Sequence, residues 1–128
     1  MSYYFKKIVA MTFDEAIDKA TEELKKEGFG VLTEIDVTGA LKKKINVDFR
    51  KYRILGACNP SFAHKALLAE DKIGTMLPCN VIIQEHSDGK IEVAAIDPIA
   101  SMQAIQNESL GEIAVKVQSK LKQVIENI

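Results

Sequence analysis

The stretch Tyr52-Arg53-Ile54-Leu55-Gly56-Ala57-Cys58-Asn59-Pro60 contains the end of a strand and the beginning of a helix. Its aromatic and β-branched residues are typical of strands. Asparagine is a favoured N-cap of helices, and proline is a favoured first helical residue. We therefore predict a strand over residues 51–58 and a helix from Pro60 to about Lys72, closed by Gly74.

The N-terminal quarter of the chain predicts a strand followed by a helix. Residues 3–9 are rich in aromatic and β-branched types, which favour a strand. Thr12 and Glu15 have the spacing of a capping box, in which each side chain bonds the backbone NH of the other residue. Apolar residues then recur every three or four positions up to Gly28, where a left-handed residue can end the helix.

The next segment contains a strand and an ambiguous region. Residues 29–37 mostly alternate between apolar and polar types, which predicts a strand with one buried face. Residues 38–44 fit a turn or a short helix, for which Thr38 could be the cap. Apolar residues alternate again over 45–49, so we expect an extended segment there.

The C-terminal half predicts a β-hairpin and a long helix. Two apolar runs at 75–85 and 90–97 are joined by the turn sequence His-Ser-Asp-Gly. Proline at position 98 ends the second run, and we expect a loop or irregular turn over 98–106. Asn107 then opens a helix with a continuous apolar stripe, and about 20 helical residues would be roughly 30 Å long.

The order of these elements predicts the fold class. Strands and helices do not alternate strictly, so a parallel α/β fold is disfavoured. We predict a single α+β domain over residues 1–128. It should be a two-layer sandwich with a mostly antiparallel sheet, helices on one face and a long C-terminal helix. The other face of the sheet must then be polar, or must meet a ligand or a second subunit.

Composition and charge exclude several classes of partner. The chain has 17 basic and 18 acidic residues, so its formal net charge of -1 gives no overall field for nucleic acid or an anionic membrane. No apolar run approaches the roughly 20 residues that span a bilayer. Lys6 and Lys7 interrupt what would have to be the apolar core of a signal peptide. We expect a cytoplasmic protein.

The two cysteines are the strongest sign of a site. Each is followed by asparagine and lies near a proline, in the segments Cys58-Asn59-Pro60 and Pro78-Cys79-Asn80. A helix beginning after Cys58 would favour its thiolate, but free cysteine is also a common small core residue. Cys79 lies in an apolar strand and fits the core. If the two strands are neighbours, both Cys-Asn pairs converge at one end of the sheet.

The other polar residues do not predict a metal or a cofactor site. A zinc site needs about four ligands, and the soft candidates Cys58, Cys79, His64 and His86 lack the short spacings of structural sites. Heme ligation has no better support. Asp97 precedes a proline, where its carboxylate can cap a turn or point into a pocket.

Residues across nearly the whole chain resemble one family, the domain-of-unknown-function family 302. The resemblance rests on the Ile-Leu-Gly-Ala-Cys-Asn-Pro segment at 54–60, the Leu-Pro-Cys-Asn-Val segment at 77–81, and Asp97-Pro98. It implies a small, dimeric α+β domain. The family has no established activity, so the resemblance assigns no catalytic residue.

Three hypotheses of function follow, one of which is a purely structural domain whose open sheet face dimerises. The first is a cytoplasmic, homodimeric domain that binds a small ligand or serves as an accessory protein, in which the Cys-Asn motifs line a small cleft. Its candidate binding residues are Cys58, Asn59, Pro60, Cys79, Asn80 and Asp97. The alternative is a thiol-dependent redox or sulfur-carrier protein, with Cys58 as the reactive thiol and Cys79 as its partner. Whether the protein is an enzyme stays open.

Overall fold

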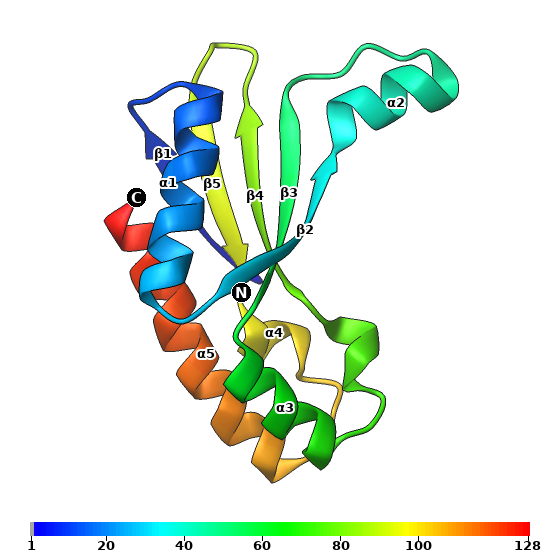
Figure 1. Cartoon of the computed structure of the whole chain (residues 1–128), viewed down its shortest axis with the longest axis vertical. Helices are drawn as coiled ribbons and strands as arrows, with labels where there is room; N and C mark the ends of the chain where they lie inside the picture. The colour runs from blue at the N-terminus through cyan, green and yellow to red at the C-terminus, as the bar shows by residue number, and fades with distance from the viewer. Residues whose placement is uncertain (1) are drawn as a thin grey trace.

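The computed structural model describes residues 2–128 and contains one sheet with helices on one of its faces (Figure 1). The elements in chain order are β1 (Tyr4–Val9), α1 (Phe13–Lys26), β2 (Gly30–Asp36), α2 (Val37–Ile45), β3 (Tyr52–Cys58), α3 (Pro60–Ala69), the 3-10 helix η1 (Ile73–Met76), β4 (Cys79–Glu85), β5 (Ile91–Ile96), α4 (Pro98–Ser101) and α5 (Glu108–Asn127). The five strands lie in the order β1-β5-β4-β3-β2. Every neighbouring pair is antiparallel, which confirms the α+β prediction.

The main core lies between the sheet and the helices α1 and α5. Both helices contact the sheet and each other, and α5 runs along the sheet as the long C-terminal helix that the sequence predicts (Figure 1). The fully buried core residues are Ala16, Ala20, Leu24, Leu55, Ala57, Val81, Ile83, Val93, Leu121 and Val124. They come from one stripe of each helix and from alternate positions of the central strands, which is the pattern expected of a two-layer packing.

The predicted signals at both ends of α1 are confirmed. The Thr12 side chain accepts a hydrogen bond from the backbone NH of Glu15, and the Glu15 carboxylate accepts one from the NH of Thr12. Gly28 follows the helix with φ of 85°. In this left-handed region a residue with a side chain is strained, so glycine suits the turn into β2.

The ambiguous segment after β2 forms the helix α2, but Thr38 is not its cap. The Asp36 carboxylate accepts from the NH of Gly39 and caps the helix instead. Thr38 uses its hydroxyl to bridge the Arg50 carbonyl and the Tyr52 NH at the start of β3. No α2 residue is buried, and the helix projects from one end of the sheet (Figure 1).

The region between β3 and β4 differs from the prediction in its boundaries. α3 ends at Ala69 instead of Lys72, and Gly74 lies inside η1 instead of closing α3. β4 begins at Cys79, four residues later than predicted, directly after a cis peptide bond between Leu77 and Pro78. Ile73 packs with residues of α3 and α5 in a second, smaller core beyond the end of the sheet.

The predicted loop over residues 98–106 is wrong in its first part. Residues 98–101 form α4, whose cap Asp97 accepts from the NH of Ile99. An aspartate before a proline is the same start signal as Asn59-Pro60, so this short helix was readable from the sequence. Asn107 caps α5 as predicted, accepting from the NH of Ser109.

The second face of the sheet carries no helix among the described residues. The alternation along the strands places one set of side chains on this open face, opposite the buried set. Its members are Tyr4, Lys6 and Ile8 of β1, Glu92, Ala94 and Ile96 of β5, Asn80, Ile82 and Gln84 of β4, Tyr52, Ile54 and Gly56 of β3, and Thr33 and Ile35 of β2. Most are apolar, so the face has the character of a binding surface.

Candidate functional site

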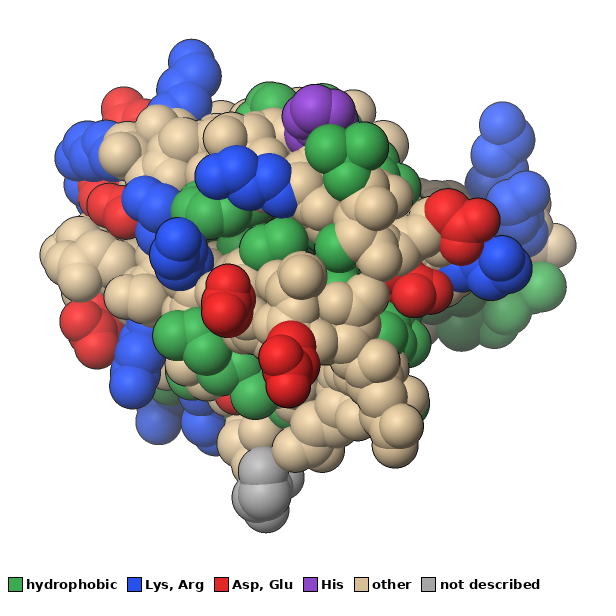
Figure 2. Space-filling model, turned by 90° about the horizontal axis from the view of Figure 1, so that it is seen from below, with side chains coloured by type: hydrophobic (Ala, Val, Ile, Leu, Met, Phe, Trp, Pro, Cys, Tyr) green, Lys and Arg blue, Asp and Glu red, His purple; other side chains and the backbone are tan. Residues whose placement is uncertain are grey.

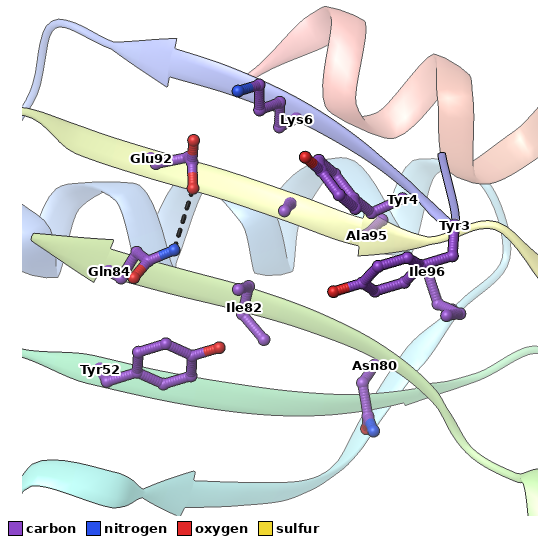
Figure 3. A pocket seen from close by; sticks show the side chains of 11 residues that line it. Tyr3, Tyr4, Lys6, Tyr52, Asn80, Ile82, Gln84, Glu92, Ala95 and Ile96 are labelled. Atoms are coloured by element: carbon purple, nitrogen blue, oxygen red, sulfur yellow. Dashed lines mark hydrogen bonds between the residues drawn. The ribbon is translucent and has the colours of Figure 1, made fainter. Parts of the chain in front are cut away.

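A hollow of about 430 Å³ lies on the open face of the sheet, over β1, β5, β4 and β3 (Figure 3). We call it the tyrosine hollow, because Tyr3, Tyr4 and Tyr52 line it and are the only tyrosines in the chain. Its apolar floor includes Ile82 and Ala94. Small-molecule sites are concave and mostly apolar, and aromatic side chains commonly line them.

The tyrosines approach the hollow from opposite sides. Tyr3 and Tyr4 lie at its β1 edge with their rings edge to face, 5.0 Å between centroids. Tyr52 lies on β3 at the other side, and the Tyr3 and Tyr52 hydroxyls both point toward the region of Ile82 (Figure 3). Aromatic faces and phenol groups therefore surround an apolar centre.

A chain of polar side chains closes one end of the tyrosine hollow. The Gln84 amide Nε2 donates to the Glu92 Oε1 at 2.9 Å, and Gln84 Oε1 accepts from the Arg50 Nε at 2.9 Å. The His86 Nε2 lies 3.5 Å from the same Glu92 oxygen. These contacts hold the Glu92 carboxylate at the hollow with its side chain only 12% exposed.

Of the residues that line this hollow, the sequence predicted only Asn80 as a candidate, and it predicted Asn80 in a cleft with the two cysteines. The alternating pattern predicts which residues of one strand share a face, but it does not show which face the helices cover or which strands are neighbours. Tyr3, Tyr52 and Glu92 come from strands that are far apart in sequence. They lie together because β5 pairs with β1 on one side and with β4 on the other, and β4 pairs with β3, which carries Tyr52.

The two cysteines lie at one end of the sheet. Ala57 pairs with Cys79 in the β3–β4 ladder, so Cys58 and Cys79 are on neighbouring strands at the end nearest α3. Cys58, Asn59 and Cys79 all line one recess of about 40 Å³, which is otherwise mainly apolar. A recess of this size has room for little more than water. Both thiols are free.

Cys79 has the properties of a core thiol. The pKa of Cys79 is raised to about 11, mainly by burial of the thiol and to a smaller extent by the neighbouring Cys58. Because the thiolate is the nucleophile, a thiol with this pKa is almost wholly protonated and unreactive at neutral pH.

Asn59 connects two helices. Its Oδ1 accepts from the NH of Phe62 in the first turn of α3, at 3.4 Å. Its Nδ2 donates to the Glu27 carbonyl at the end of α1, also at 3.4 Å. Pro60 is the exposed first residue of α3. Both residues therefore shape the backbone after Cys58.

Asn80 and Asp97 have different surroundings from Asn59. The Asn80 side chain makes no hydrogen bond to any residue within 2–128, and it lines the tyrosine hollow. The Asp97 Oδ1 accepts from the NH of Ile99 at 3.0 Å and from the Gln118 Nε2 at 3.1 Å. Asp97 thus joins α4 to α5, and the structure does not bring it together with the cysteines in their recess.

A second hollow of about 460 Å³ lies beside α2 and is lined by charged side chains and two phenylalanines. Three of its six charged side chains are in ion pairs, Lys42 with Asp48 and Arg53 with Glu34. The buried Arg53 Nε has no hydrogen-bond partner among the described residues.

The surface at the α3 and α4 end has no dominant charge. Figure 2 shows hydrophobic side chains there in separate patches, divided by acidic and basic ones. Within residues 2–128 no group of three His, Cys, Asp or Glu side chains is arranged to hold a metal ion. No helix in the same range has the length and apolar character needed to cross a bilayer.

The fold and the site define a two-layer α+β domain with one uncovered sheet face. The family described as "Domain of unknown function DUF302" matches residues 5–128, and the chain belongs to this family. It is similar to the crystal structure of an uncharacterized conserved DUF302 protein from Bacillus stearothermophilus. That likeness has a TM-score of 0.92 and 28% sequence identity, and it covers 99% of this chain and 98% of the other. A comparison with curated proteins finds no match.

Proposed function

We propose that this protein is a homodimeric domain that binds a small molecule in the tyrosine hollow. The observation that carries the proposal is the hollow itself, of about 430 Å³, with an apolar floor and a few fixed polar groups. Ligand sites of small molecules are typically about 300 to 1,000 Å³ and have this composition. Free thiols fit a reducing compartment, so we place the protein in the cytoplasm.

The cysteine recess supports a structural role better than a catalytic one. At about 40 Å³ it is too small for a substrate, and Cys79 stays protonated at neutral pH. A redox or sulfur-carrier function would need an accessible thiolate. The alternative function using Cys58 and Cys79 therefore has less support than ligand binding.

The proposed homodimer uses the β2 edge and α2, which we call the β2–α2 edge (residues 32–47). Its exposed apolar side chains are Leu32, Ile35, Ile45 and Val47. A nine-residue helix is only marginally stable alone in water, and α2 buries no residue within its own chain. A second copy packed on the β2–α2 edge would bury these side chains and stabilise the helix.

The charges near the β2–α2 edge also fit a second copy. Residues 34–48 carry three acidic side chains and three lysines. In a two-fold dimer the same patch meets itself, so an interface with both signs can be self-complementary. The β2–α2 edge lies on the far side of the sheet from β1, so this dimer would leave the tyrosine hollow open to ligand.

Fragment mapping by NMR tests the ligand site. The probe is a set of small fragments of neutral, cationic, anionic and zwitterionic type, added to uniformly labelled protein. We expect the largest amide shift changes at Ile82, Gln84, Glu92 and Ala94. Changes that cluster instead at Phe13 and Phe49 in the second hollow, or an absence of binding, would refute the proposal.

A matched pair of variants sharpens this test. Tyr52→Ala removes a wall of the tyrosine hollow and should weaken fragment binding at least tenfold. Asp14→Ala removes an exposed side chain of the second hollow and should leave binding unchanged. Equal effects of the two substitutions would show that the fragments do not bind in the tyrosine hollow.

A further inference from the structure

We propose that the ligand of the tyrosine hollow is a small zwitterion with an apolar body, such as an α-amino acid with a large apolar side chain. This inference rests on the proposed ligand site and adds the chemical class of its ligand. The ligand class is inferred from one acidic and one basic side chain, which line the same hollow and do not form an ion pair with each other.

Glu92 provides the acidic group. Only its Oε1 has partners, namely the Gln84 amide and the His86 ring nitrogen. The Oε2 accepts no hydrogen bond from any residue within 2–128. A carboxylate held in place by neighbours, with one oxygen unused at a hollow, is suited to receive an ammonium group.

Lys6 provides the basic group. Its side chain lines the tyrosine hollow from β1 and forms no ion pair or hydrogen bond with the rest of the described chain. Its neighbour Lys7 points to the other face and donates to the Ile128 carbonyl, which shows that a lysine of this strand can be fully engaged. Lys6 is therefore available to a carboxylate.

The register sets the distance between these two groups. Lys6 pairs with Ala94, and Glu92 pairs with Ile8, so Lys6 and Glu92 are diagonal neighbours on β1 and β5 (Figure 3). Diagonal neighbours have Cα atoms about 7–8 Å apart, with Cβ atoms somewhat closer. Their flexible side chains can hold a compact ligand group between them, with its ammonium at Glu92 and its carboxylate at Lys6.

The rest of the hollow suits an apolar body. Ile82 and Ala94 form an uncharged floor next to Glu92, and the tyrosine rings stand around it. An aromatic ring placed there can stack on Tyr3 or Tyr52, and pairs of aromatic rings attract beyond the burial of their area. A free anion or a free cation would use only one of the two charged groups.

Calorimetric titration with three related probes tests the inference. L-Phenylalanine carries both charges, 2-phenylethylamine lacks the carboxylate, and 3-phenylpropionate lacks the ammonium. Since hydrogen bonds to charged groups are strong, we expect L-phenylalanine to bind at least about tenfold more tightly than either analogue.

Two variants assign each charge to its residue. Glu92→Gln should weaken L-phenylalanine and 2-phenylethylamine about tenfold and leave 3-phenylpropionate unchanged. Lys6→Met should weaken the two carboxylates and leave 2-phenylethylamine unchanged. The matched controls Glu22→Gln and Lys65→Met change exposed charges on α1 and α3, and should leave all three affinities unchanged. Circular dichroism checks that each variant is folded.

The outcomes separate this inference from the proposed function. If fragments map to the tyrosine hollow but L-phenylalanine binds no more tightly than its analogues, the ligand class is wrong and the site stands. If each variant weakens all three probes equally, the assignment of the charges is wrong. If the fragments map to the tyrosine hollow but none of the three probes binds there, the ligand class is refuted and the site stands. If neither the fragments nor the three probes shift the Ile82 and Ala94 amides, both the site and the ligand class are refuted.

Discussion

Gly56 of β3 lies close to Pro78, the residue directly before β4, and a Cβ atom added to Gly56 would stand 2.8 Å from the Pro78 Cγ. The same Cβ would also collide with the Thr33 hydroxyl of β2. Each of the two cysteine segments therefore contributes one of these contacting residues. Glycine at this position lets the strands around the cysteines approach one another.

We predict that Gly56→Ala destabilises the protein. The added methyl group must displace Thr33 or Pro78, and overpacking of this kind costs about 1–3 kcal/mol. Urea unfolding of the variant should show a lower midpoint. Gly30→Ala is the control, because nothing lies within 4 Å of its added Cβ. A Gly56→Ala protein as stable as wild type would show that the contact relaxes freely.

We predict that the two Cys-Asn motifs differ in their effect on stability. Asn59→Ala removes the cap of α3 and the bond to Glu27, and loss of an asparagine cap costs about 0.5–2 kcal/mol. Asn80→Ala breaks no hydrogen bond and should change the free energy of unfolding by less than about 0.5 kcal/mol. Thermal and urea unfolding of both variants measure the difference. Equal losses would contradict these separate roles.

We predict that Cys79 makes stability fall at alkaline pH. The pKa of Cys79 is raised from 9.0 to about 11 in the folded protein. Below pH 9 the thiol is protonated in both the folded and the unfolded chain, so its contribution to the free energy of unfolding is fully present. Between pH 9 and 11 the unfolded chain loses the proton first, and stability falls by roughly 2–3 kcal/mol.

The control for this prediction is Cys79→Ala, which has no thiol to titrate. Other groups also titrate above pH 9, so the relevant quantity is the difference in unfolding free energy between wild type and Cys79→Ala. As the pH rises from 9 to 11, the unfolding free energy of the wild type should fall relative to that of Cys79→Ala. A difference that is constant with pH would mean that the folded state does not raise the pKa of Cys79.

We predict that Ile45→Glu dissociates the homodimer. Ile45 is 63% exposed on α2, and a carboxylate there would be buried without a partner if a second copy covers the β2–α2 edge. Sedimentation at several concentrations should show dimers of the wild type and monomers of the variant. Leu68→Glu, at a still more exposed position on α3, should remain dimeric. Monomeric wild-type protein at every concentration would refute the homodimer.

Local signals in the sequence predicted most of the elements correctly. The capping box at Thr12 and Glu15 and the caps at Asn59 and Asn107 act within one turn of chain, so they can be recognised without knowledge of the fold. The errors had two causes: the local start signal of α4 at Asp97-Pro98 was overlooked, and at Thr38 distant contacts compete with local preference. Thr38 bonds Arg50 and Tyr52 instead of capping α2.

The candidate site was less predictable than the fold. The convergence of Cys58 and Cys79 depended on their strands being neighbours, which the sequence left open and the structure shows. The small size of their recess could not be read from the sequence, because it depends on how α3, α4 and α5 pack over the end of the sheet. Tyr3 and Glu92 were not noticed, since neither belongs to a motif.

The sequence by itself determined most of the elements, the caps of α1, α3 and α5, and the α+β class, because spacing and capping depend on residues within a few positions of each other. The tertiary structure decided the strand order, the uncovered face and the grouping of Lys6, Tyr52 and Glu92 at one hollow. Strand pairing joins residues that are distant in the chain. Which pairs form depends on burying the apolar faces of all the strands and helices together, and no single segment contains that information.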